Sequence, residues 1–293
     1  MRLVTINSGG RLQAGVETGD GVVALADLGP DMPDSVLGVI AGGAEVLARI
    51  AAALPGAAVR AAGSYALVAP IPRPAKNIFC VGKNYVDHAH EFQNSGFDSS
   101  SAGQDVPEVP IVFTKAPNSV TGPETEVEAG LDADGTLDYE GELAVVIGTG
   151  GRGISRAQAL DHVFGYTIVN DITARAAQNR HKQWFLGKSA DGFCPMGPAV
   201  VTADEVGDVT ALRLATRVNG ETRQDALVSN LIFDIPTIIE TISRAITLEP
   251  GDIIATGTPE GVAIGFKPPR YMVPGDVVEV EVSGIGVLRN RIV

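Results

Sequence analysis

Cysteine and positive charge are scarce in this sequence, and each scarcity excludes a class of protein. Cys80 and Cys194 are its two cysteines, and neither belongs to a Cys-x-x-Cys pair. This excludes a disulfide-stapled scaffold and a thiolate zinc site. Lys and Arg number 22 against 35 Asp and Glu, which gives a formal net charge of −13. Nucleic acid and anionic membranes are bound by clustered positive charge, so we expect neither as a partner.

Long hydrophobic runs are also lacking. The longest alanine-rich stretch, residues 41–69, is interrupted by charged residues and by Pro55, so we expect no membrane span. The first residues lack the charged and apolar regions of a signal peptide. With the low cysteine count, these features predict a soluble protein of a reducing cytoplasm. The 293 residues, 45% of them hydrophobic, suffice for one large domain or two modest ones.

The sequence predicts two units that meet near residue 70. Short strands separated by glycine turns, followed by a helix, are expected at residues 3–6, 14–17, 22–25 and 34–54. The proline-rich run at 70–74 indicates a stiff connector. We therefore predict a small N-terminal α/β domain over residues 1–70 and a second domain over residues 71–293.

The second unit has the pattern of a β-rich α+β domain. Strands and turns predominate after residue 111, and one further helix is expected over residues 231–246. Two Pro-Gly-Asp sequences, at 250–252 and 274–276, each precede a strand and fit a type II turn. Residues 93–108 are rich in Ser, Gly and Asp, and we predict a mobile loop that serves as a lid.

The segment DYEGELAVVI, residues 138–147, joins alternating acidic residues to an apolar strand. As one strand it would place Asp138, Glu140 and Glu142 on the same face, with the two glutamates roughly 6–7 Å apart. Like charges at that distance repel unless a cation neutralises them, and hard divalent cations take oxygen ligands. The alternative is a sheet edge with solvated glutamates.

A second predicted strand, residues 164–169, ends next to Asp171, and a helix is expected from Thr173. An acid at that place is positioned to complete a three-carboxylate site, although it is also a common helix N-cap. Between the two strands, residues 148–153 match the G-x-G-x-x-G pattern of dinucleotide-binding proteins. A first Rossmann strand is apolar on both faces, whereas the strand before this run carries acids. We therefore predict a tight turn and keep a nucleotide-binding oxidoreductase as an alternative.

Two further segments carry reactive side chains. On a helical turn that starts near residue 84, His88 and Glu91 are neighbours at i and i+3. A carboxylate bound to one imidazole nitrogen leaves the other nitrogen able to take a proton from water. Lys188 lies between two glycines near the only Trp and is placed to hold a substrate carboxylate or an oxyanion. The alternative for all three residues is an ordinary solvated surface.

Taken together, these segments resemble the fumarylacetoacetate hydrolase family over roughly residues 73–293. The motifs are N-Y-x-D-H-x-x-E at 84–91, D-Y-E-G-E-L at 138–143, G-Y-T-I-V-N-D-I-T-A-R at 165–175, G-K-S-x-D at 187–191 and A-T-G-T-P-x-G-V at 255–262. The resemblance implies a mixed β-sandwich roll with a small N-terminal domain, usually in a homodimer. It also implies a Mg²⁺ or Mn²⁺ ion held by Glu140, Glu142 and Asp171.

The resemblance implies small-molecule substrates of the 2-oxo acid or diketo acid type. Lys188 would bind substrate and stabilise the enolate, and Thr258 would bind the substrate carboxylate. His88 and Glu91 match the pair that orients and deprotonates water in hydrolytic members. Because isomerisation needs no activated water, this pair favours hydrolysis or decarboxylation.

We therefore expect a Mg²⁺- or Mn²⁺-dependent hydrolase that cleaves a C–C bond in an acylpyruvate or fumarylpyruvate. The alternatives are an oxaloacetate-type decarboxylase and an isomerase or decarboxylase of aromatic catabolism, of the 2-hydroxyhepta-2,4-diene-1,7-dioate type. A non-catalytic binding protein is disfavoured, because a binding module needs no His–Glu pair.

Overall fold

The computed structural model describes residues 1–93 and 106–293. The larger sheet consists of β1 (Arg2–Ser8), β2 (Arg11–Thr18), β3 (Gly21–Ala24), β4 (Ala66–Val68), β5 (Ile78–Gly82), β6 (Ile111–Lys115), β7 (Val120–Thr121), β10 (Gly141–Ile147), β11 (Val163–Asn170), β13 (Cys194–Thr202) and β16 (Ile253–Ala255). The smaller sheet consists of β8 (Glu126–Val127), β14 (Arg213–Val218), β15 (Glu221–Leu227), β17 (Val277–Val282) and β18 (Gly286–Ile292). A separate ribbon pairs β9 (Leu137–Asp138) with β12 (Thr173–Ala174).

Short helices connect these strands. The α-helices are α1 (Val36–Ala53), α2 (Val86–Gln93), α3 (Arg175–His181), α4 (Phe185–Lys188), α5 (Ala203–Val206) and α6 (Ile235–Ser243). The 3₁₀ helices are η1 (Leu25–Asp27), η2 (Pro117–Ser119), η3 (Ala129–Leu131), η4 (Ala159–His162), η5 (Val209–Ala211), η6 (Val228–Asn230) and η7 (Ala263–Gly265). The predicted loop over residues 93–108 falls largely on residues 94–105, outside the described part of the chain.

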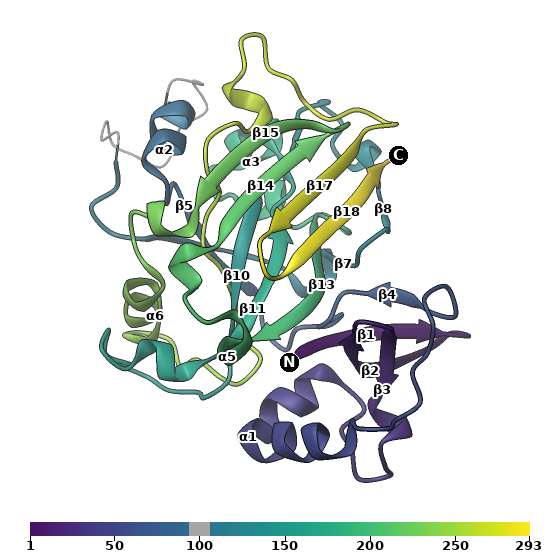
Figure 1. The fold of residues 1–293 in the computed structure, drawn as a ribbon. Coiled ribbons are helices and arrows are strands. Elements are labelled where there is room, and N and C mark those ends of the chain that lie inside the picture. The colour runs from purple at the N-terminus through teal and green to yellow at the C-terminus, as the bar shows by residue number, and fades with distance from the viewer. Residues whose placement is uncertain (94–105) are drawn as a thin grey trace.

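The two sheets pack face to face, and the main core lies between them (Figure 1). The strand order is β3-β2-β1-β13-β11-β10-β16-β5-β6 in the larger sheet and β15-β14-β17-β18-β8 in the smaller. Strand β17 has the sequence VVEVEV and buries Val278, Val280 and Val282, as expected where one sheet face is covered. Strand β10 is buried along its whole length because both of its faces are covered: Leu143 joins the core between the sheets and Ala144 joins a second core. The β-rich α+β sandwich expected from the sequence is confirmed.

The N-terminal strands extend the larger sheet, because β1 pairs antiparallel with β13. Helix α1 buries Val36, Val39 and Ile40 in the second core, against residues of β1 and β2. The strands and the helix expected in this region are therefore present, and Figure 1 shows them together at one end of the molecule. The domain boundary at residue 70 stays a prediction.

Length and composition alone would allow α1 to cross a membrane, although the core helix of a soluble protein meets the same criteria. At Gly43 the backbone leaves the helical region, with φ 57° and ψ −146°, so α1 consists of two shorter helices joined by a kink. A membrane-spanning helix needs about 20 consecutive residues, which neither part contains. The expectation that this region does not span a membrane stays a prediction.

Both Pro-Gly-Asp sequences form the expected turns. Asp252 N donates to Glu249 O at 3.0 Å and Asp276 N donates to Val273 O at 3.1 Å. Gly251 and Gly275 have φ of 90° and 102°, the left-handed conformation that a type II turn requires at its third residue.

The glycine-rich run at 148–153 forms a tight connection that is not followed directly by a helix. Backbone N–H groups of Gly148, Gly151 and Gly153 donate to backbone carbonyls at 2.7–2.9 Å. These donors are therefore used within the protein, and the run does not form the phosphate-binding turn of a Rossmann fold.

Three predicted elements differ from the structure. The strand expected over residues 138–147 is interrupted at residues 139 and 140, because β9 pairs with β12 whereas β10 pairs with β11 and β16. The helix expected from Thr173 begins at Arg175, because Thr173 and Ala174 form β12. The helix expected over 231–246 is confined to α6, whose start is set by Asp234, an N-cap that accepts from Thr237 N at 2.9 Å.

Candidate active site

Three carboxylates meet where β10 begins and β11 ends. Glu142 lies in β10, Glu140 directly precedes this strand, and Asp171 directly follows β11. The antiparallel pairing sets Gly141 opposite Asn170, which brings the acids together. One oxygen of each carboxylate lies within 4.8 Å of the others, and all three residues are buried. The structure therefore assembles the predicted cluster of Glu140, Glu142 and Asp171.

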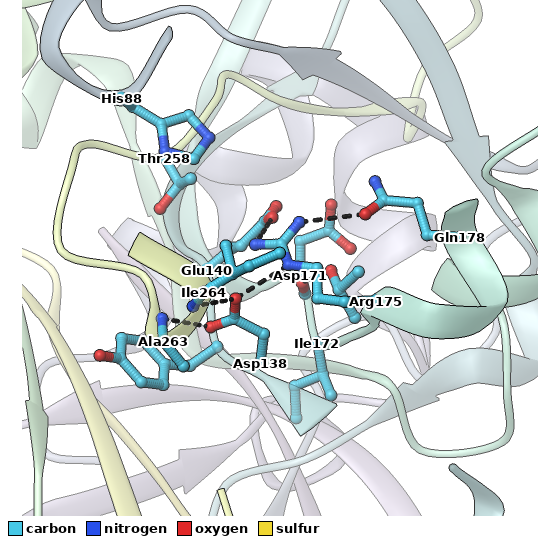
Figure 2. Close-up of polar contacts among 12 residues, drawn as sticks. His88, Asp138, Glu140, Asp171, Ile172, Arg175, Gln178, Thr258, Ala263 and Ile264 are labelled. Atoms are coloured by element: carbon cyan, nitrogen blue, oxygen red, sulfur yellow. Dashed lines mark hydrogen bonds and ion pairs between the residues drawn. The ribbon is translucent and has the colours of Figure 1, made fainter. Parts of the chain in front are cut away.

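Asp138 does not join this cluster, contrary to the expectation of one acidic strand face. Its carboxylate accepts from Ala263 N at 2.7 Å, from Ile264 N at 3.1 Å and from Arg175 Nε at 2.8 Å (Figure 2). The interruption places Asp138 in β9 and Glu142 in β10, so the two acids do not belong to one continuous strand. Asp138 thus links the ribbon to η7 and holds Arg175.

Buried cations surround the acidic cluster. Lys188, at the end of α4, donates from Nζ to Glu140 Oε2 and to Asp171 Oδ2, both at 2.7 Å. Lys115, at the end of β6, donates to Asp171 Oδ1 at 2.5 Å. Arg175 Nη2 lies 2.6 Å from Glu140 Oε1 in an ion pair. The predicted Lys188 is therefore part of the cluster, whereas sequence reasoning did not identify Lys115 or Arg175.

Signals for the missed residues are present in the sequence. Lys115 ends the apolar strand sequence IVFTK, where a charged side chain is expected to need a buried partner. Arg175 and Gln178 lie three residues apart at the start of α3, and Arg175 Nη1 donates to Gln178 Oε1 at 3.2 Å (Figure 2). Arg175 also ends the motif at 165–175, which contains the predicted Asp171.

The carboxylates of the cluster have different electrostatic surroundings. Burial raises the pKa of Glu140, but the charges of Lys188 and Arg175 outweigh burial and lower the pKa to about 2. For Glu142, burial raises the pKa well above its usual range, and the negative charges of Asp171 and Glu140 raise it further. Glu142 Oε2 accepts from Gly257 N at 2.8 Å. No described residue forms an ion pair with it.

The cluster fits a hard divalent cation. Its oxygen atoms are the ligand type that Mg²⁺ and Mn²⁺ prefer. The pKa of Glu142 stays raised because the charge of Lys188 does not offset burial and the neighbouring carboxylates, and a bound cation would supply further positive charge.

His88 and Glu91 lie on α2 in the expected i, i+3 arrangement. His88 Nδ1 is 3.3 Å from Glu91 Oε2. Gly261 N donates to both oxygens of Glu91, at 3.0 and 3.2 Å. The two side chains are 5% and 16% exposed, so neither is an ordinary surface residue.

Thr258 follows β16 in a loop whose backbone is tightly packed. Gly257 has φ of 109°, and a Cβ there would lie 2.7 Å from Asn84 Cβ, so this position requires glycine. Gln224 Nε2 donates to Thr258 Oγ1 at 2.7 Å, and Gln224 Oε1 accepts from Gly141 N at 3.1 Å. Gln224 therefore connects the predicted substrate-binding threonine to the strand that carries the acids.

A pocket connects several of these residues. Its lining comprises Val81, Gly82, Lys83, His88, Phe92, Phe113, Glu140, Glu142, Arg175, Gln178, Trp184, Lys188 and Thr258. His88 and Thr258 lie on one side of Glu140, and Arg175 lies below them (Figure 2). Glu91 and Asp171 do not line the pocket. Glu91 contacts His88 and Asp171 contacts Lys188, and both of these partners line it.

Comparison with known proteins agrees with this geometry. A family model described as fumarylacetoacetate (FAA) hydrolase C-terminal matches residues 77–293. The chain belongs to this family. It is 54% identical over 226 residues to oxaloacetate tautomerase YisK of Bacillus subtilis (strain 168), a match that covers 77% of this chain and 72% of that protein.

Two solved structures of the family are similar over the whole chain. A fumarylacetoacetate hydrolase from Exiguobacterium antarcticum is 43% identical with a TM-score of 0.84, covering 100% of this chain and 99% of the other. Maleylpyruvate hydrolase from Sphingobium sp. SYK-6, in complex with manganese(II) ion and pyruvate, is 32% identical with a TM-score of 0.80 and the same coverage. The family and the fold are therefore confirmed, whereas the homodimer and the cytoplasmic location stay predictions.

Proposed function

We propose that this chain interconverts the enol and keto forms of a short 2-oxo dicarboxylic acid such as oxaloacetate. The observation that carries the proposal is that His88 lines the same pocket as Lys188 and the acids Glu140 and Glu142. A base and a cation that face one small pocket suit the removal of a proton next to a carbonyl. The 54% identity to a protein named oxaloacetate tautomerase supports this substrate.

The His–Glu pair is compatible with this reaction, although the sequence argument used it to favour hydrolysis. An imidazole whose Nδ1 is held by a carboxylate presents Nε2 as a base. Such a base takes a proton from carbon as well as from water. The pair therefore indicates proton transfer, and the substrate determines which bond reacts.

We further propose that Glu140, Glu142 and Asp171 hold Mg²⁺ or Mn²⁺. When bound there, the ion would supply Lewis-acid polarisation of the 2-oxo acid. The oxygen donor set and the raised pKa of Glu142 support this assignment. The manganese(II) ion in the Sphingobium neighbour provides a precedent within the family.

In the proposed reaction, His88 Nε2 accepts the proton from C3 of the keto form. The electron pair of the broken C–H bond forms the C2–C3 double bond, and the carbonyl π electrons move to the C2 oxygen. The Lys188 ammonium carries three hydrogens, of which Glu140 and Asp171 accept two, so the third is available to that oxygen. Thr258 binds the substrate carboxylate. Transfer of the proton held by His88 to the C2 oxygen completes the enol and restores the neutral imidazole, and ketonisation follows the reverse path.

Hydrolysis of a C–C bond in a diketo acid is the second candidate. The Sphingobium neighbour is named as a hydrolase of maleylpyruvate. His88 would then take the proton from water, and the resulting hydroxide would attack the distal carbonyl. The C–C bond would break to give a carboxylic acid and the enolate of a 2-oxo acid. Decarboxylation of oxaloacetate would instead release carbon dioxide from the same kind of enolate.

One substrate panel separates these reactions. The full chain is treated with chelator, reloaded with Mg²⁺ or Mn²⁺, and given the enol form of oxaloacetate, an acylpyruvate, fumarylpyruvate and a 2-hydroxyhepta-2,4-diene-1,7-dioate. Faster loss of enol absorbance with no change in product mass supports tautomerisation. Carbon dioxide release or two organic products from any substrate would favour decarboxylation or hydrolysis. Full activity in metal-free buffer would refute the metal assignment.

A further inference from the structure

Glu91 occupies a narrow space between α2 and the loop that contains η7. Phe92 of α2 is buried in one apolar cluster with Val262 and Ile264, which flank and form η7. This contact brings the two segments close together. On the same side, both oxygens of Glu91 accept from Gly261 N. Glu91 therefore depends on the η7 loop as well as on its own helix.

Gly265 is the last residue of η7. Because it has no side chain, the carboxylate of Glu91 can lie against its backbone. A Cβ added at Gly265 would overlap Oε1 and Cδ of Glu91 and would lie 2.5 Å from Cγ. Real Cβ atoms essentially never approach another heavy atom within 3.0 Å. A Cβ at position 265 and the Glu91 side chain in its present position therefore exclude each other. The φ of Gly265 lies outside the left-handed region, so an alanine at this position is compatible with the backbone.

We propose that Gly265 is a positioning residue for the His88–Glu91 pair. The three atoms nearest to the added Cβ all belong to the Glu91 side chain. An alanine would therefore displace this side chain and leave the backbone of η7 in place. The displaced carboxylate would lose both Gly261 N and His88 Nδ1. The imidazole would then lose the contact that holds its proton on Nδ1 and keeps Nε2 available as the base.

The test uses Gly265→Ala, Glu91→Ala and the double variant in the metal-loaded full chain. The catalytic readout rests on the proposed function and follows the enol of oxaloacetate. We expect Gly265→Ala to lower kcat/KM by roughly 10-fold to 100-fold, less than the full 10²–10⁴-fold that a general base typically contributes, because the imidazole itself is still present. In the Glu91→Ala background the same substitution should change kcat/KM by less than about 2-fold, because no carboxylate remains to displace. Equal losses in both backgrounds, or full activity of Gly265→Ala, would overturn the proposal.

Gly130→Ala is the matched control. Gly130 also lies in a 3₁₀ helix, η3, and its φ is likewise outside the left-handed region. A Cβ added there would meet nothing within 4 Å. We expect this variant to retain the activity and melting temperature of the unsubstituted chain. A similar loss of activity in both glycine variants would assign the effect to helix propensity and contradict the role of Gly265.

A second readout does not need the proposed function. Imidazole ¹⁵N NMR reports which nitrogen of His88 carries the proton, and His88→Ala assigns its signals among the four histidines. We expect Gly265→Ala and Glu91→Ala to shift His88 in the same way, away from the Nδ1–H form. If oxaloacetate is not turned over but this shift is seen, the proposed function fails and the positioning role stands. An unchanged tautomer in Gly265→Ala would refute the positioning role.

Discussion

The acidic cluster and the His88–Glu91 pair face one pocket but are held in different ways. Glu140 lies 2.6–2.7 Å from two buried cations, and Asp171 contacts two lysines. The His88–Glu91 contact is longer, at 3.3 Å, and Glu91 is held by a backbone N–H from a distant loop. Paired strands thus fix the cluster, whereas the position of the proposed base, His88, depends on the docking of a short helix. Substitutions should therefore affect stability in the first region and mainly turnover in the second.

The largest effect is expected when a carboxylate of the cluster is neutralised. Glu140→Gln leaves Lys188 paired only with Asp171 and Arg175 paired only with Asp138, and removing one member of a buried ion pair costs about 3–5 kcal/mol. We expect loss of activity and a lower free energy of unfolding, measured by urea denaturation of the metal-free chain. Because the pKa of Glu140 is lowered to about 2, its contribution to stability is present above its unfolded pKa and is lost as the pH falls toward 2.

Glu142→Gln is the matched control for this prediction. The pKa of Glu142 is raised by burial and by the neighbouring carboxylates, so its charged form is disfavoured in the metal-free fold. We expect this variant to lose activity while its free energy of unfolding without metal stays the same or rises. If both glutamine variants are destabilised equally, the assigned difference between the two acids is wrong.

The next effect concerns the base. His88→Ala should lower kcat by about 10²–10⁴-fold, the usual contribution of a general base. Because His88 contacts Glu91 and no cluster acid within hydrogen-bond distance among the described residues, Mg²⁺ or Mn²⁺ affinity and the melting temperature should change little. Steady-state kinetics and calorimetric metal titration test both parts. An unchanged rate would remove His88 from the mechanism, and a large loss of metal affinity would contradict the separation of the two regions.

The sequence predicted the acids better than their surroundings. Alternating acids before an apolar strand, with Asp171 after the next strand, suffice to predict the cluster, since antiparallel neighbours bring such positions together. The interruption at residues 139 and 140 was not predictable, because it depends on β9 pairing with β12, about 35 residues away. The contact of Glu91 with Gly261 spans 170 residues and leaves no local signal. Local patterns therefore predict which residues meet at the candidate site, whereas the groups that orient them are set by tertiary contacts.

Metal binding should depend on pH through the cluster alone. Because the pKa of Glu142 is raised well above its usual range, the metal-free protein retains a proton there that a bound cation must displace. Affinity should therefore rise as the pH increases above the ordinary range of a glutamate, with proton release on binding. Calorimetry in two buffers of different ionisation enthalpy measures this release. Identical apparent enthalpies in both buffers for the unsubstituted chain would contradict the raised pKa of Glu142.

The smallest effect is expected at Thr258, which belongs to neither region. Its hydroxyl accepts from Gln224 Nε2 and can donate its hydrogen to a substrate carboxylate. A hydrogen bond to a charged group contributes about 1.5–3 kcal/mol, so Thr258→Val should raise KM roughly 10-fold or more, with little change in kcat. Thr258→Ser keeps the hydroxyl and should stay close to the unsubstituted chain. A loss confined to kcat would instead show that Thr258 acts on the reacting atoms and would extend the catalytic region to the loop after β16.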